Sequence, residues 1–204
     1  KDGIRELDMT DLAYRGSDSW ANYVKGVFVY LADLGFAFPH GLDIAFYGNI
    51  PNGSGLSSSA SFELLVGVIA RKVYTLDIDT LGLVKVGKRV ENDFIGVNSG
   101  IMDQFAVGMG KKDHAIFLDC ATLEYELVPV KLADYRIVIM NTNKRRELAD
   151  SKYNERFAET RIALKELQEH VDIESLGDLT IDQFDELKHH LSSELFVKRA
   201  RHAV

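Results

Sequence analysis

The chain has 204 residues, of which 46% are hydrophobic and 27% charged, a composition typical of folded globular proteins rather than disordered ones. Its 31 acidic residues outnumber 24 basic ones, and no long basic block is present that could neutralise a nucleic-acid backbone or an anionic membrane. The single cysteine, Cys120, excludes an internal disulfide, and no N-terminal apolar segment resembles a signal peptide or a membrane span, so we expect a cytosolic protein without nucleic-acid or membrane partners.

The first predicted elements are a helix and a strand. Residues 1–18 are polar and weakly patterned, and glycines interrupt them. From a cap at Asp18 or Ser19, apolar side chains recur every three or four positions until Gly35, which predicts a helix. Residues 41–48 instead alternate apolar and polar side chains, as a strand with one buried face does.

A glycine- and serine-rich stretch, residues 51–61, follows this strand and leads into a helix that begins near Ser58. Gly53 and Gly55 can adopt positive φ and approach a ligand closely, while the serines supply hydroxyls and an N-cap. The unpaired N–H groups and positive dipole end of the helix favour an anion at this point. The stretch lacks the Lys of a Walker A loop and the third Gly of the dinucleotide fingerprint, so it predicts a phosphate-binding loop of another kind.

The remaining elements follow from similar patterns. A second helical pattern covers residues 78–93, and a turn rich in glycine and asparagine then leads into a short helix near Asp103. Three strands are predicted next, at residues 115–119, 123–130 and 135–140, and the helical period returns at residues 151–170 and from residue 181 to the end. This order favours an α+β fold, with a domain boundary near residues 140–143.

Three polar residues have the chemistry of a phosphoryl-transfer site if the fold brings them together. Mg²⁺ takes few protein oxygens and keeps several waters, so the hydroxyl of Ser59 and the carboxylate of Glu91 suffice as direct ligands. Asp103 would then face the acceptor hydroxyl, orient it and take its proton.

Four motifs resemble those of a known family. The loop is similar to the P-x-x-x-G-L-S-S-S-A motif of the GHMP kinases, the superfamily of galactokinase, homoserine kinase and mevalonate kinase. The run N-S-G-I-M-D-Q-F at residues 98–105 matches a galactokinase motif, and residues 141–156 resemble that family's N-T-x-x-x-R-x-L-x-x-S-x-Y-N-x-R segment. Residues 198–204 look like the start of the family's R-A-x-H-V-x-x-E-N stretch, so the resemblance spans nearly the whole chain.

This resemblance implies a GHMP kinase fold and an ATP-dependent kinase that phosphorylates α-D-galactose at the anomeric hydroxyl with Mg²⁺. It implies an incomplete ribosomal S5 domain 2-like N-terminal domain at residues 1–140, followed by the beginning of a ferredoxin-like C-terminal domain at residues 141–204. By the same resemblance, Asp103 is the catalytic base and contacts the sugar, Gly100 and Tyr153 bind galactose, and Ser59 and Glu91 hold Mg²⁺. The residues implied to bind the ATP phosphates are Gly53, Ser54, Gly55, Leu56, Ser57, Ser58 and Ser59.

The departures from the family pattern also carry expectations. Galactokinases begin with a P-G-R-V-N-L-I-G-E-H-x-D-Y segment, which supplies an Arg and sugar contacts, and end with a glycine-rich motif; neither occurs here. We therefore expect an internal piece of a longer galactokinase, with little or no activity alone and with exposed apolar surface that promotes self-association.

Three alternatives stay open from the sequence. The parent protein could phosphorylate N-acetylgalactosamine or another small alcohol, because the absent N-terminal segment holds much of the sugar discrimination. It could also be a non-catalytic sensor that binds galactose and ATP and relays this to a transcriptional partner. The third alternative is an α+β interaction domain in which the Gly/Ser loop only turns a corner.

Overall fold

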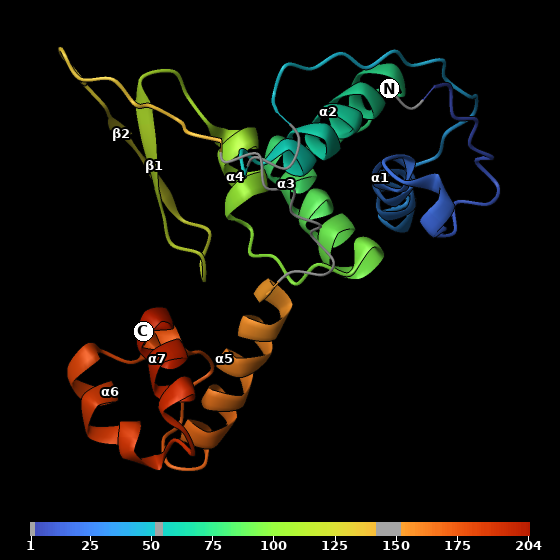
Figure 1. Cartoon of the computed structure of the whole chain (residues 1–204). Coiled ribbons are helices and arrows are strands. Elements are labelled where there is room, and N and C mark those ends of the chain that lie inside the picture. Colours follow the sequence, from blue (N-terminus) through green and yellow to red (C-terminus); the bar gives the residue numbers. More distant parts are fainter. Residues whose placement is uncertain (1–2, 52–54, 142–151) are drawn as a thin grey trace. The chain divides into compact units, whose positions relative to one another are not determined.

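The computed structural model describes residues 3–51, 55–141 and 152–204. Two compact units follow one another along the chain, residues 1–147 and residues 148–204. Figure 1 shows the helices and the two-stranded sheet of the first unit and the helices of the second. Among the described helices, none is both long enough and apolar enough to cross a membrane.

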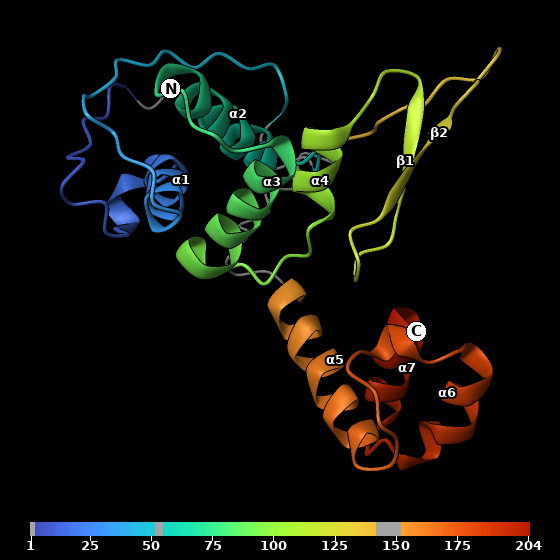
Figure 2. The ribbon, with the colours of Figure 1, turned by 180° about the vertical axis from the view of Figure 1, so that it is seen from behind.

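The first unit is built on four helices that share one hydrophobic core. They are α1 (Ala21–Asp33), α2 (Ser58–Val73), α3 (Thr80–Arg89) and α4 (Met102–Met109). Helices α2, α3 and α4 pack on one another, and α1 packs on α2 and α3, an arrangement that can be followed from both sides in Figures 1 and 2. The core residues include Leu31, Val66, Val84 and Phe105, each at most 1% exposed. The apolar stripes predicted for these segments therefore face a common interior.

Local sequence signals set the ends of these helices. Gly35 adopts a φ of +90°, the N–H of Gly35 donates to Ala32 O, and the N–H of Phe36 donates to Leu31 O. These two hydrogen bonds form a Schellman motif that ends α1, as the glycine predicted. At the start of α3, the Asp79 carboxylate accepts a hydrogen bond of 2.6 Å from the Gly82 N–H.

The helix predicted at residues 78–93 is confirmed in α3 but changes its geometry at its end. Residues Val90–Ile95 continue α3 as one π-helical stretch, which ends at Gly96 with a φ of +86°. Such wider turns insert an extra residue per turn and often occur at functional sites. Here the π-helical stretch carries Glu91, which is only 4% exposed.

The strand predictions are confirmed in part. Strands β1 (His114–Leu118) and β2 (Tyr125–Pro129) form an antiparallel pair in which Ile116 lies opposite Leu127. Strand β2 begins later than predicted because Leu123 has a φ of +63° and belongs to the connecting turn. The Asp119 carboxylate stabilises that turn by accepting hydrogen bonds from the N–H groups of Ala121 and Thr122.

The strands predicted at residues 41–48 and 135–140 are wrong for the described part of the chain. Both segments lack regular secondary structure, since no described strand pairs with either of them. Burial nevertheless alternates along residues 42–47, because Leu42, Ile44 and Phe46 are partly buried while the residues between them are exposed. The apolar side chains of residues 135–140 are largely exposed instead.

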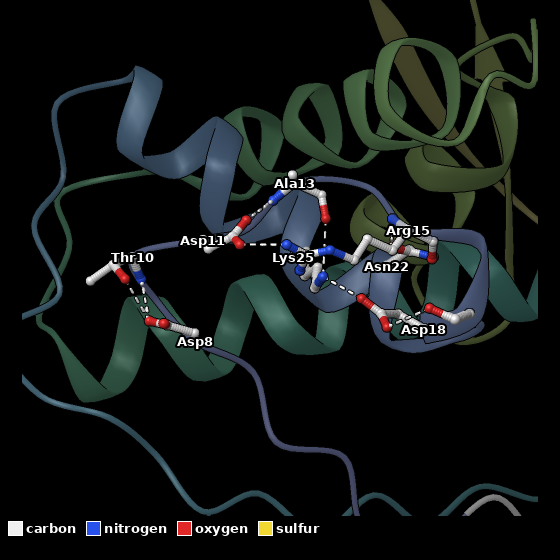
Figure 3. Close-up of polar contacts among 9 residues, drawn as sticks. Asp8, Thr10, Asp11, Ala13, Arg15, Asp18, Asn22 and Lys25 are labelled. Atoms are coloured by element: carbon white, nitrogen blue, oxygen red, sulfur yellow. Dashed lines mark hydrogen bonds and ion pairs between the residues drawn. The ribbon is translucent and has the colours of Figure 1, made fainter.

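A buried lysine connects the segment before α1 to the helix itself (Figure 3). Lys25 is 2% exposed, and its Nζ donates to Ala13 O at 3.0 Å and forms an ion pair with Asp18. One turn earlier, the Asn22 amide donates to Arg15 O at 2.7 Å and accepts from the Arg15 N–H at 3.2 Å. The polar N-terminal segment is therefore fixed to α1 by buried side chains rather than by regular structure.

Replacing Lys25 by methionine is expected to lower the free energy of unfolding by about 2–3 kcal/mol. Methionine keeps most of the apolar stem but leaves the Ala13 carbonyl without its charged donor, and hydrogen bonds to charged groups contribute about 1.5–3 kcal/mol. Urea-induced unfolding measures the change. The exposed Lys72 on α2 provides the matched control, and K25M unfolding at the same urea concentration as K72M would contradict this role.

The second unit contains a small helical core of its own. Its helices are α5 (Lys152–Gln168), α6 (Ile181–Leu187) and α7 (Glu194–Ala203). Leu167 and Phe184 are both fully buried in this core. The helix predicted from residue 181 to the end is interrupted after Leu187, and α7 begins anew where the Ser193 hydroxyl accepts from the Phe196 N–H.

Candidate active site

The phosphate-loop prediction concerns the entry into α2. Gly55 has a φ of +76° and Ser57 a φ of 53°, so the chain turns through two left-handed residues before α2 begins at Ser58, the predicted start. Ser57 occupies the N-cap position, but the expected side-chain cap is absent among the described residues. A capping side chain needs an extended backbone at the N-cap, which the left-handed Ser57 does not have. The first N–H groups of α2 therefore have no side-chain cap from Ser57.

Only some of the other residues of the predicted loop are described by the structure. Gly53 and Ser54 lie outside the described residues. Leu56, Ser58 and Ser59 are partly buried beside the start of α2.

Ser59 and Glu91 are in direct contact. The Ser59 hydroxyl donates to Glu91 Oε1 at 2.5 Å, which joins the first turn of α2 to the π-helical stretch. The Ser99 hydroxyl donates to Glu91 Oε2 at 2.6 Å, and the Asn92 amide donates to Ser99 O at 3.2 Å. The N–H of Val97 donates to the Glu91 carbonyl at 2.8 Å. Glu91 thus fixes both the start of α2 and the turn that leads to α4.

Asp103 lies in the first turn of α4, where the helix dipole favours an acidic side chain. It is partly exposed, as a group that must reach a ligand should be. Gly100, in the turn before α4, is exposed, and a Cβ added there would meet no atom within 4 Å. Residues 99–103 therefore connect Ser99, which is hydrogen-bonded to Glu91, directly to the predicted base, Asp103.

The negative charges of these acids affect the pKa values of two further side chains. Burial raises the pKa of Glu63, on α2, to about 9, and the negative charges of Glu91 and Asp103 raise it further while a hydrogen bond from Gln104 opposes the shift. Burial also raises the pKa of Tyr23, on α1, to about 12, with Glu63 and Glu91 contributing. Glu91 and Asp103 thus both lie within electrostatic reach of Glu63.

The family model for the GHMP kinases N terminal domain matches residues 22–111. Galactokinase from Enterococcus faecalis is 58% identical over 202 residues, and galactokinase from Streptococcus mutans is 57% identical over the same length; each alignment covers 99% of this chain and 52% of the relative. The crystal structure of Lactococcus lactis galactokinase complexed with galactose superposes with a TM-score of 0.93 at 53% identity, over 97% of this chain and 51% of that one.

Over 99% of its length the chain is similar to galactokinases, and residues 22–111 match the GHMP kinases N terminal domain. It spans about half the length of the curated galactokinases that it matches. In fold, it matches the GHMP kinase N-terminal domain as a mostly helical structure with a small sheet.

The predicted galactose-binding residue Tyr153 belongs to the second unit. It lies in the first turn of α5, and its side chain is 48% exposed. Its role in a galactokinase site stays a prediction, as does that of Gly100.

Oxygen donors at the Ser59–Glu91 contact suit the Mg²⁺ that galactokinases typically use with ATP. Among the described residues, no group of three or more His, Cys, Asp or Glu side chains could hold a metal ion. Mg²⁺ does not require such a cage, because it is usually held by one or two carboxylates together with phosphates and water. A hydroxyl and a carboxylate 2.5 Å apart beside a helix N-terminus fit this donor set.

No role was predicted for three residues of this region, Ser99, Glu63 and Gln104, although Ser99 and Gln104 lie in the motif at residues 98–105. Ser99 could have been found from its place between the two predicted acids, because a buried carboxylate needs donors for both oxygens. The contact between Glu63 and Gln104 has no such signal, since helical period alone does not show that two polar side chains meet inside the core.

Proposed function

We propose that the whole protein containing this chain transfers the γ-phosphoryl group of ATP to the anomeric hydroxyl of α-D-galactose. The observation that carries this proposal is the 2.5 Å hydrogen bond between the Ser59 hydroxyl and the Glu91 carboxylate. Asp103 lies on α4, the helix that follows the π-helical stretch in the chain. Supporting it, galactokinases align with almost the whole chain, and the Lactococcus lactis enzyme was crystallised with galactose.

The residues of this chain have distinct proposed tasks in that reaction. Residues 53–59 and the first N–H groups of α2 bind the phosphates of ATP, since a helix N-terminus favours negative charge. Ser59 and Glu91 hold Mg²⁺, which supplies charge neutralisation for the phosphate oxygens when bound. The second oxygen of Glu91 accepts from Ser99, which keeps the carboxylate in one orientation.

Asp103 acts as the catalytic base in this proposal. It accepts a hydrogen bond from the anomeric hydroxyl, orients its oxygen toward the γ-phosphorus and takes its proton as the new P–O bond forms. Gly100 and Tyr153 bind the sugar, and the exposed backbone at Gly100 leaves room for a ligand to approach.

The finer assignment of the fold is part of the same proposal. We assign residues 1–140 to a ribosomal S5 domain 2-like domain and residues 141–204 to the beginning of a ferredoxin-like domain. The helical core of residues 152–204, which is separate from the core around Phe105, supports a division in this part of the chain.

A panel of sugars tests the substrate. ADP release by the whole protein is measured with galactose, N-acetylgalactosamine, glucose and no sugar, each with and without MgCl₂. The proposal predicts the highest kcat/KM with galactose and loss of turnover without Mg²⁺. Faster turnover of N-acetylgalactosamine would identify the sister kinase, and binding of galactose and ATP without turnover would identify a sensor; either result would overturn the proposed activity.

A further inference from the structure

A buried acid and a buried amide face each other behind the proposed site. Glu63, on α2, is 1% exposed, and Gln104, on α4, is fully buried. The Gln104 amide nitrogen donates to Glu63 Oε2 at 3.2 Å. The other two oxygens of the pair, Glu63 Oε1 and Gln104 Oε1, have no hydrogen-bond partner among the described residues.

This pattern is unfavourable if Glu63 is ionised. A buried ionised carboxylate is stable only when it is paired or fully hydrogen-bonded, and among the described residues no ion pair involves Glu63. The titratable groups that influence it are Glu91 from the π-helical stretch, Asp103 from α4 and Tyr23 from α1, none of which is a cation.

The α3 backbone lies close against the pair. A Cβ added at Gly87 would lie 3.0 Å from Gln104 Cγ and 3.1 Å from Glu63 Oε2. The absence of a side chain at Gly87 therefore lets α2, α3 and α4 meet at this point.

A single proton on Glu63 Oε1 would turn this oxygen into a donor, and Gln104 Oε1 is an acceptor that lacks a partner among the described residues. A carboxylic acid and an amide paired in this way would exchange two hydrogen bonds, one in each direction.

We propose that Glu63 is a protonated carboxylic acid in the folded protein at neutral pH and that two hydrogen bonds join it to Gln104. This pairing holds Asp103 in position relative to Ser59. Glu63 lies one helical turn after Ser59 on α2, and Gln104 directly follows Asp103 on α4. The pair therefore links the helix of the proposed metal-binding hydroxyl to the helix of the proposed base. Glu63 and Gln104 are positioning residues, and this role rests on the proposed kinase activity.

The burial that raises the pKa of Glu63 to about 9 agrees with this protonation state. Bound Mg²⁺ would offset the charge of Glu91, but it would leave the burial of Glu63 unchanged. Burial is the largest cause of the shift.

The protonation state is tested first, without any assay of activity. Side-chain carboxyl ¹³C NMR of the whole protein, with the Glu63 signal assigned by its loss in the Glu63→Gln variant, is followed from pH 5 to pH 9. The proposal predicts the chemical shift of a protonated acid at pH 7. A Glu63 signal at the ionised position at pH 7 would overturn the proposal, whether or not the protein phosphorylates galactose.

The pH dependence of stability is an independent test of whether Glu63 is protonated. The folded-state pKa of Glu63 lies above the ordinary value of 4.5, so the folded protein retains a proton that the unfolded chain releases. The stability contributed by Glu63 is thus fully present below pH 4.5 and is lost as the pH rises toward 9. We expect the melting temperature of the wild type to fall relative to that of E63Q over this window, and parallel curves would contradict the proposal.

Activity then tests the positioning role. Glutamine at position 63 can exchange the same two hydrogen bonds with Gln104, whereas methionine of similar size makes neither. We expect E63Q to keep kcat within about threefold and E63M to lose about tenfold to a hundredfold in kcat with little change in the KM for ATP, because small misplacements of reacting groups are costly. Loss of activity in E63Q, or a folded E63M with the kcat of the wild type, would refute the positioning role; if E63M does not fold, NMR and E63Q decide.

Discussion

Replacing Asp103 by asparagine is expected to lower the kcat of galactose phosphorylation by about 10²–10⁴-fold, the usual contribution of a general base. Asparagine has almost the same shape but cannot take the proton of the anomeric hydroxyl. Because Asp103 is partly exposed in the first turn of α4, the substitution leaves the core of the first unit intact. Release of ADP, followed by a coupled assay with the whole protein, measures the loss.

Binding experiments separate loss of chemistry from loss of the site. Calorimetric titration should give D103N an affinity for Mg²⁺-ATP close to that of the wild type, since the residues proposed to bind the nucleotide are unchanged. The exposed Asp113, which has a left-handed φ that asparagine also tolerates, provides a matched control as D113N. D103N with at least a tenth of the wild-type kcat would contradict the role of Asp103 as base.

Replacing Glu91 by glutamine should affect both catalysis and stability. Glu91 is 4% exposed and accepts from Ser59 and Ser99, one hydroxyl on each carboxylate oxygen. Glutamine has only one acceptor oxygen, so one hydroxyl faces an amide nitrogen and loses its bond, at a cost of about 1–3 kcal/mol in unfolding free energy. Loss of the carboxylate charge should also raise the Mg²⁺ concentration required for half-maximal activity by about tenfold or more.

Urea-induced unfolding and an activity titration with MgCl₂ measure the two effects of E91Q. Asp93, in the same π-helical stretch, has a side chain that is 59% exposed, so D93N removes one negative charge from the same segment without touching the Ser59 contact. S59A should share the Mg²⁺ requirement of E91Q while losing less stability. An E91Q protein with the Mg²⁺ dependence of D93N would refute Glu91 as a metal ligand.

Much of the first unit could be predicted because local signals decide its helices. Gly35 ends α1 through its left-handed backbone, and the apolar period before it faces the common core. The Gly/Ser stretch predicted that the loop ends and α2 begins near Ser58, where the structure has the start of α2. These features depend on a few neighbouring residues, which a sequence displays directly.

The failures concern contacts between distant segments. Residues 41–48 have the alternation of a strand, but a strand also needs a partner, which no described residue supplies. The π-helical stretch at Val90–Ile95 that carries Glu91 packs against α1, a distant contact, and no period in the sequence marks its geometry. The pairing of Glu63 with Gln104 joins residues far apart in the chain, so their contact could not be predicted, although Gln104 lies in the motif at residues 98–105.

The residue roles themselves were predicted from motifs, and the structure adds their local geometry. Ser59 and Glu91 were expected to cooperate, and their side chains are hydrogen-bonded. The roles proposed for Gly100, Asp103 and Tyr153 depend on where galactose binds, which the sequence motifs imply and the experiments above address.

The metal position provides the most direct test of the account. Crystals of the whole protein grown with galactose, a non-hydrolysable ATP analogue and Mn²⁺ in place of Mg²⁺ would locate the metal by its anomalous scattering. The account predicts a peak in contact with Ser59 Oγ and the Glu91 carboxylate, with the Asp103 carboxylate within hydrogen-bonding distance of the anomeric hydroxyl. A metal peak away from both Ser59 and Glu91, or an Asp103 carboxylate that faces away from the sugar, would contradict it.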